Sequence, residues 1–184
     1  MVDLLPFLTS VIGLRDAHGK GHSQHVMELS SAFGRKVDLA AAQVETLAFA
    51  AEIHDIGKIA INEFIVNKPG RFTEAEYLMI QHHAELGANL IETLNLDPLI
   101  PLIIRHHHEN FDGSGYPDKL KGDQIPLEAR IIRITDTYDA LTSNRGYRPA
   151  FTPRKALAIM EQDHDFFDPE LLEIFFKMQR GRKH

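Results

Sequence analysis

Apolar residues recur along this chain at the three- and four-residue spacing of amphipathic helices, and the alternation typical of strands is almost absent. The first apolar stripe spans residues 4–12, and a second spans residues 26–33 and is expected to end at Gly34. An Ala-rich segment over 38–53 predicts a third helix. The first part of the chain is therefore expected to be helical.

Capping signals mark where the later helices begin. Thr73 and Glu76 form a capping box that opens a long helix to about Leu94, and Pro126 opens another. Residues 109–125 are rich in glycine and turn residues and are expected to form an ordered loop. The predicted fold class is all-α, a bundle of about seven to nine helices. An N-cap residue followed by proline occurs three times, at Asp97-Pro98, Thr152-Pro153 and Asp168-Pro169.

Length and charge narrow the class of protein. With 184 residues, 43% of them hydrophobic and 25% charged, residues 1–184 are expected to form a single globular domain without a separate sensor domain. The formal net charge of -6 argues against binding of nucleic-acid polymers. The absence of cysteine excludes disulfides, thiol catalysis and Cys-ligated clusters, and it fits a cytoplasmic location. No apolar run predicts membrane insertion.

Histidines and carboxylates occur at five places where they could bind metal. Imidazole and carboxylate without thiolate suit Fe, Mn, Zn, Co or Ni more than Mg or Ca. Seven ligands exceed what one ion takes, so two divalent ions are expected, with a carboxylate such as Asp55 as a bridge. Paired ions are a recurring device for phosphoester hydrolysis. The seven candidates are His22, His54, Asp55, His83, His107, His108 and Asp136.

Helix geometry and base rates limit this interpretation. Adjacent side chains on a helix point about 100° apart. His107 and His108 can therefore share a site only at a helix end or across two ions, and His106 should point away. A single histidine on a helix is more often a surface or core residue than a ligand. That interpretation is kept for His25, His82, His106, His164 and His184.

Three ordered motifs give the ligand interpretation its weight. In this order they make the chain resemble the HD-GYP domain, a bacterial branch of the HD phosphohydrolase superfamily, over about residues 15–170. The resemblance implies an all-α fold around a di- or trinuclear centre, commonly of iron or manganese. It also implies hydrolysis of cyclic di-GMP to linear pGpG and often on to GMP. The motifs are His54-Asp55-Ile56-Gly57-Lys58, His107-His108-Glu109 and Asp112-Gly113-Ser114-Gly115-Tyr116-Pro117.

The resemblance assigns a role to each matching residue. The seven candidates become metal ligands, with Asp55 as the bridge. Lys58 would act with Asp55 in catalysis by contacting a substrate phosphate; a solvated lysine after a turn is the alternative. Arg145 and Arg148 would help to hold the phosphates, since the arginine fork binds phosphate oxygens in pairs. Ordinary salt bridges within the loop are the alternative for these two arginines.

The Gly-Tyr-Pro loop has more than one interpretation. Gly113 and Gly115 permit backbone geometry barred to other residues. Tyr116 and Pro117 would either cover the site or touch partners such as diguanylate cyclase GGDEF domains. A purely structural loop is the alternative.

Two histidines depart from the family pattern. His18 stands where some members have a glutamate that supports a third metal ion. Because imidazole cannot bridge two ions, we expect two ions rather than three, with His18 as either an additional ligand or an exposed loop residue. His25 stands where the family usually has arginine, and its role stays open.

The expected mechanism is attack on phosphorus by a hydroxide that bridges the two ions, with Lys58 stabilising the developing charge. Asp139, three residues after Asp136, is expected to orient a ligand or Lys58 without binding metal itself. The alternatives are hydrolysis of another cyclic dinucleotide such as cyclic GMP-AMP, a binding module that signals through the Gly-Tyr-Pro loop, and a diiron oxygenase. The complete ligand set favours catalysis, and Lys58 with the arginines favours phosphate. The oligomeric state stays open.

Overall fold

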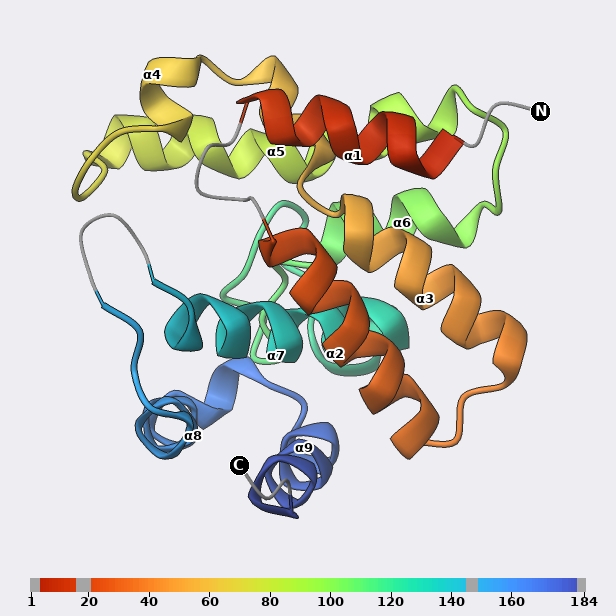
Figure 1. Ribbon diagram of the computed structural model, residues 1–184, viewed down its shortest axis with the longest axis vertical. Helices are drawn as coiled ribbons and strands as arrows, with labels where there is room; N and C mark the ends of the chain where they lie inside the picture. Colours follow the sequence, from red (N-terminus) through yellow and green to blue (C-terminus); the bar gives the residue numbers. More distant parts are fainter. Residues whose placement is uncertain (1–3, 16–20, 145–148, 182–184) are drawn as a thin grey trace.

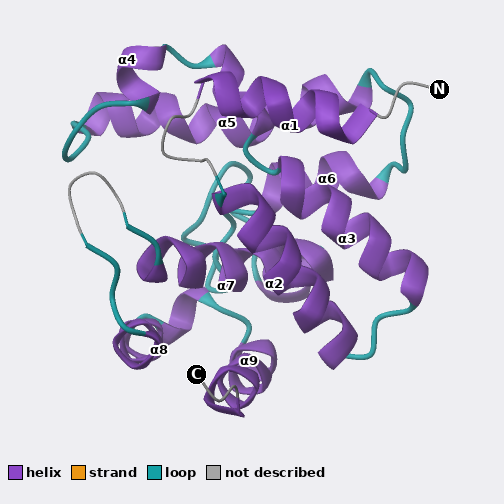
Figure 2. Cartoon of the chain, in the orientation of Figure 1, coloured by secondary structure: helices purple, strands orange, loops and turns teal. Residues whose placement is uncertain are grey.

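The computed structural model describes residues 4–15, 21–144 and 149–181. Within these ranges the chain forms nine α-helices and three short 3-10 helices without a strand, which confirms the all-α prediction (Figure 2). None of the helices in the described ranges is long and apolar enough to cross a membrane. In chain order the elements are α1 (Leu4–Arg15), α2 (His22–Lys36), α3 (Ala41–Ile53), η1 (Ile56–Ala60), α4 (Glu63–Val66), α5 (Glu74–Glu92), α6 (Leu99–His106), η2 (Gly122–Gln124), α7 (Leu127–Thr142), α8 (Pro153–Gln162), η3 (His164–Phe166) and α9 (Pro169–Gly181).

Two sets of packed helices meet around one apolar core. α2 packs on α3 and α7, while α5 packs on α6 and η1. Figure 1 shows α5 at one end of the molecule and α8 and α9 at the other, with α2 and α7 between them. The Phe175 ring of α9 meets Phe33 of α2 and Tyr138 of α7 edge to face, with centroids 5.2 and 5.3 Å apart. This cluster fixes α2 beside α7 and so sets where their polar faces lie.

Three of the later helices, α5, α8 and α9, begin where the capping signals predict. Thr73 Oγ1 accepts a hydrogen bond from the Glu76 amide at 3.3 Å, and Glu76 Oε2 accepts one from the Thr73 amide at 2.7 Å. α8 and α9 start at the prolines of the Thr152-Pro153 and Asp168-Pro169 pairs. α6 starts one residue later than predicted, at Leu99, whose amide donates to Asp97 Oδ1 at 2.9 Å.

The prediction that Gly34 ends the second helix is wrong. α2 continues to Lys36, and the residue with a left-handed backbone is Asp38, at φ 59°. Gly34 is buried instead against α3, where a Cβ would stand 2.9 Å from Leu47 Cδ2. The glycine therefore permits close packing of two helices, a role that helix spacing alone does not distinguish from a C-terminal cap.

The loop over 109–125 is tied to the end of α6. Arg105 binds both carboxylate oxygens of Asp118, with Nε at 2.6 Å and Nη2 at 2.9 Å. Buried Glu109 accepts the Asp118 amide at 2.7 Å. A Cβ on Gly115 would overlap the backbone at Asn110, so only glycine fits there. These contacts hold the Gly-Tyr-Pro segment beside the last turn of α6.

Candidate metal centre

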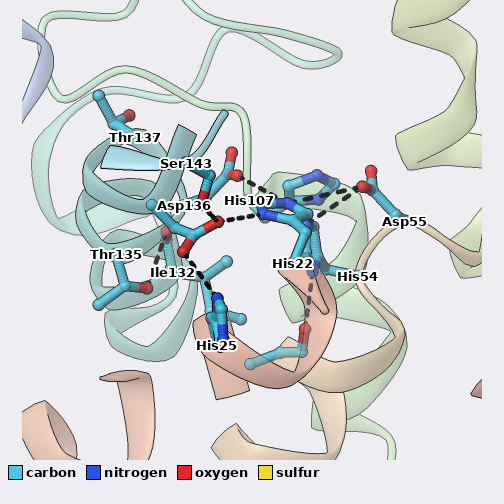
Figure 3. A network of polar contacts seen from close by, with 12 residues as sticks. His22, His25, His54, Asp55, His107, Ile132, Thr135, Asp136, Thr137 and Ser143 are labelled. Atoms are coloured by element: carbon cyan, nitrogen blue, oxygen red, sulfur yellow. Dashed lines mark hydrogen bonds and ion pairs between the residues drawn. The ribbon is translucent and has the colours of Figure 1, made fainter. Parts of the chain in front are cut away.

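The seven predicted ligands converge where α2, α3, α5, α6 and α7 meet. Figure 3 shows His22, His54, Asp55, His107 and Asp136 within this cluster. Three overlapping groups of these side chains offer ligand atoms within 4.8 Å of one another. His107 caps the end of α6, and His106 turns away to bind Asp118 at 3.0 Å. The groups are His22 with His54 and Asp136, His54 with Asp55 and His107, and His83 with His107 and His108.

Asp55 lies between the two outer groups. Its Oδ1 is 3.4 Å from His83 Nε2, whereas its Oδ2 is 3.5 Å from His54 Nε2 and 3.9 Å from His22 Nε2. The two oxygens of one carboxylate thus face different sets of imidazoles. This is the arrangement that a carboxylate needs in order to serve two adjacent ions.

Three imidazoles are oriented by the backbone of their own helices. Nδ1 of His54, His83 and His107 contacts the carbonyl oxygen three residues earlier, at 2.7, 2.6 and 2.6 Å. Because a carbonyl oxygen can only accept, each Nδ1 carries the proton, and the lone pair of the neutral ring lies on Nε2. All three Nε2 lone pairs therefore point into the cluster, as metal-binding histidines require.

The lone-pair arrangement fits a metal ion. His83 Nε2 and His107 Nε2 are 3.3 Å apart, and with both Nδ1 atoms protonated neither nitrogen has a proton to share. Burial lowers the pKa of His83, His107 and His108, which keeps these rings neutral. Facing lone pairs repel unless a cation lies between them. Neutral imidazoles and ionised carboxylates are the donors that divalent transition metals prefer.

His22 is held from both sides by carboxylates. Its Nδ1 is 2.7 Å from Asp139 Oδ2, and its Nε2 is 3.2 Å from Asp136 Oδ1. Burial alone would lower the pKa of His22, but the bonds to Asp136 and Asp139 outweigh burial and raise it to about 10. His25, which is mostly exposed, also faces Asp139, at 3.5 Å. Asp139 thus lies on the outer side of His22, away from the other six candidates.

The carboxylates in the cluster are ionised. Burial would raise the pKa of Asp55, but Lys58 and the surrounding histidines hold it well below its usual value. Burial likewise opposes ionisation of Asp136, and the bond to His22 outweighs it. Lys58 Nζ lies 2.7 Å from Asp55 Oδ2, so a positive charge stands directly beside the carboxylate between the two groups. The site therefore combines ionised carboxylates with a positive charge at Lys58.

A cavity of about 640 Å³ opens onto the cluster. The residues that line it include His22, Asp55, Lys58 and Asp136. Tyr116 lines it too, with its ring 4.9 Å from the ring of His108. The volume lies in the range of pockets that bind molecules the size of a cofactor or drug. Tyr116 therefore lines the cavity, and the covering of the site by this loop stays a prediction.

Four residues named in the sequence analysis lie outside the described ranges: His18, Arg145, Arg148 and His184. Conversely, several residues that line the cavity were not predicted. Sequence reasoning missed Arg133 although its spacing from Asp136 places both on one helix face. Phe72 and Tyr77 also escaped notice, because nothing in their local sequence separates them from core residues. The unpredicted lining residues include Phe72, Tyr77, Asn110, Arg133 and Thr137.

Fold and site together define an all-helical domain with buried histidines and aspartates that suit divalent metal ions. A family model described as HD domain matches residues 6–171, and the chain belongs to this family. The predicted membership of the HD-GYP branch is confirmed by this match together with the curated relatives that follow.

Two curated relatives and one solved structure illustrate the relationship. The cyclic di-GMP phosphodiesterase PA4108 of Pseudomonas aeruginosa is 35% identical over 173 residues, which is 92% of this chain and 42% of the relative. The 3'3'-cGAMP-specific phosphodiesterase 3 of Vibrio cholerae is 37% identical over 161 residues, which is 87% of this chain and 35% of the relative. The chain therefore spans less than half the length of either relative. Bd1817, an HDG"Y"P protein from Bdellovibrio bacteriovorus, shares the fold with a TM-score of 0.72 at 20% identity, over 87% of this chain and 52% of that one.

Proposed function

We propose that this chain hydrolyses a phosphodiester bond of a cyclic dinucleotide with two divalent transition-metal ions, and that cyclic di-GMP is its substrate. The position of Asp55 carries the proposal. One of its oxygens faces each set of histidines, and it lines a cavity of nucleotide size beside Lys58. The relatives of 35% and 37% identity are named as cyclic dinucleotide phosphodiesterases, which supports the same substrate class.

Each ion has its own set of ligands in this proposal, and Asp55 belongs to both. Iron or manganese is favoured, and Zn, Ni or Co suits the same donors. When bound, paired ions polarise the phosphoryl oxygens and lower the pKa of water so that it attacks phosphorus at neutral pH. The two sets are Asp55 Oδ2 with His22, His54 and Asp136, and Asp55 Oδ1 with His83, His107 and His108.

Lys58 and Asp139 have separate tasks. Lys58 stabilises the negative charge that develops on the phosphate while water adds to phosphorus and the bond to the 3′ oxygen breaks. The 3′ oxygen takes a proton, so the first product is linear pGpG, and a second hydrolysis yields GMP. Asp139 holds the Nδ1 proton of His22 and so keeps His22 Nε2 directed at the cluster.

Cyclic GMP-AMP is the second candidate substrate, because a relative of 37% identity is named as specific for it. The metal cluster acts on the phosphate and does not distinguish the two compounds. Contact of the Gly-Tyr-Pro loop with GGDEF domains stays a prediction.

Adjacent histidines of α5 provide a matched pair of variants for the test. His83 is buried in the cluster, whereas the side chain of His82 is 65% exposed. Protein loaded anaerobically with Fe(II) or Mn(II) is incubated with cyclic di-GMP or cyclic GMP-AMP, and products are separated by chromatography. We expect pGpG from wild type and H82A, and none from H83A. If wild-type protein with two ions bound per chain forms product from neither cyclic di-GMP nor cyclic GMP-AMP, the proposal is contradicted.

A further inference from the structure

One guanidinium in the cavity wall has no task in the mechanism above. Arg133 lies on α7 three residues before Asp136, so both side chains lie on the same face of the helix. Its guanidinium also stands over the ring of Phe167, 5.4 Å from the centroid. Arg133 therefore lines the same cavity as the candidate metal ligands, and its guanidinium packs on the ring of Phe167.

Two neutral side chains fix the direction of this guanidinium. Nε donates to Asn110 Oδ1 at 2.9 Å, and Nη1 donates to Thr137 Oγ1 at 2.6 Å. Asn110 donates its own amide to Ser114 Oγ at 2.9 Å, and Thr137 Oγ1 donates to the Arg133 carbonyl at 2.8 Å. Both partners thus present acceptors to Arg133 and have their own protons engaged elsewhere. The arginine is oriented without being neutralised.

No carboxylate forms an ion pair with Arg133 within the described part of the chain, although Asp136 acts on its charge from a greater distance. Among the described residues, Arg133 Nη2 makes no hydrogen bond, so its two N–H groups are available as donors. A cation withdrawn from water without a counter-charge is costly, and a bound anion removes that cost. By contrast, Arg130, one turn earlier on α7, is paired with Asp168 at 2.7 Å and with Asp123 at 2.9 Å.

We propose that Arg133 binds the second phosphate of the cyclic dinucleotide, the one that is not being hydrolysed. This inference rests on the proposed function. A cyclic dinucleotide carries two phosphates in one ring. Among the described residues, Lys58 with the metal ligands accounts for only the reacting phosphate; Arg145 and Arg148, predicted to help hold the phosphates, lie outside the described ranges. The available Nη2 donors match the geometry of phosphate oxygens. Arg133 would therefore orient the ring, so that the phosphate opposite it reaches the cluster.

The test compares a substrate with two phosphates against one with a single phosphate. R133Q and wild type are assayed with cyclic di-GMP and with bis(p-nitrophenyl) phosphate. We expect R133Q to raise KM for cyclic di-GMP about 10- to 100-fold, the effect of losing a charge-assisted hydrogen bond. Turnover of bis(p-nitrophenyl) phosphate should stay within twofold. R154Q makes the same charge change at an exposed position of α8 outside the cavity and should alter neither substrate.

The R133K variant tests whether the effect of R133Q on KM comes only from a change in the protein structure. It keeps the charge and the aliphatic stem but removes the fork, so KM for cyclic di-GMP should rise while melting temperature and metal content match wild type. An unchanged KM in both variants, or an equal loss with both substrates, would overturn the assignment of Arg133. Competition by cyclic di-AMP gives a further check. If R133Q weakens the binding of cyclic di-GMP but leaves inhibition by cyclic di-AMP unchanged, Arg133 contacts the guanine base rather than the phosphate, and the assignment is overturned.

Failure of the proposed function would look different. Wild type would hydrolyse bis(p-nitrophenyl) phosphate and would neither bind nor cleave any cyclic dinucleotide. That result removes the substrate class itself and the inference with it, whereas the outcomes above leave the substrate class intact.

Discussion

Gly57 lies so close to His83 that a methyl group on its Cα would overlap the His83 carbonyl oxygen. The same methyl group would stand 2.5 Å from the amide nitrogen of Gly87, one turn further along α5. This close approach of η1 to α5 brings Asp55 Oδ1 within 3.4 Å of His83 Nε2. The distance between two candidate ligands from separate elements therefore depends on the absence of a side chain at Gly57.

Replacement of Gly57 by alanine should force η1 away from α5. We expect a loss of about 1–3 kcal/mol in the free energy of unfolding, as for other overpacked sites, together with reduced metal content. Denaturant unfolding and elemental analysis measure the two effects. The control is Gly13→Ala in α1, where a Cβ meets no atom within 4 Å and alanine should be neutral or stabilising. Unaltered metal content in G57A would show that the contact does not set the site.

Replacement of Asp55 by alanine should abolish metal binding and activity together, because both sets of imidazoles lose their shared carboxylate. Metal per chain is measured by elemental analysis after anaerobic loading, and activity by product chromatography. Asp165→Ala is a suitable control, since Asp165 is exposed and, among the described residues, is paired with His164 at 3.3 Å, far in the sequence from the candidate ligands. A D55A protein that still holds two ions would exclude the bridging role.

Removal of the metal should lower stability. A ligand that binds only the folded state stabilises it by about 2.7 kcal/mol at one hundred times its dissociation constant. The ions would also separate the facing lone pairs of His83 and His107, 3.3 Å apart. Chelation should therefore lower the melting temperature of wild type and of H82A but not that of H83A. Equal shifts in H82A and H83A would place the stabilising ions elsewhere.

Asp118 should make the loop sensitive to acid. Its bonds to Arg105, and a further bond to His106, lower the Asp118 pKa to about 2. A lowered folded-state pKa means that this contribution is complete above the unfolded value of about 3.9 and is lost as pH falls towards 2. Because the carboxylate is partly exposed, we expect D118N to cost only about 1 kcal/mol at pH 7.

Unfolding of D118N and wild type across pH measures this difference, which should shrink to near zero at pH 2. D123N removes a more exposed partner of Arg130 and should cost less at every pH. A difference between D118N and wild type that does not depend on pH would mean that the Asp118 carboxylate acts through packing rather than charge.

Local sequence determined the helices of this protein and the chemical types of its ligands. The capping box of Thr73 and Glu76 and the Pro153 start predicted helix boundaries, because caps involve residues within one turn of each other. Four of the seven candidate ligands, His54, Asp55, His107 and His108, lie in local motifs that occur in family order. The role of Gly34 was misjudged, since its neighbour Leu47 is distant in sequence.

Only the tertiary structure decided how those residues act together. The two faces of Asp55, the bond between His22 and Asp139 across 117 positions, and the bond from Arg133 to Asn110 are all relations between separate segments of the chain. Helical periodicity states which face of a helix is buried, but not which neighbour covers it. Packing of α2 on α7 and of η1 on α5 makes that choice, and with it the geometry of the metal centre.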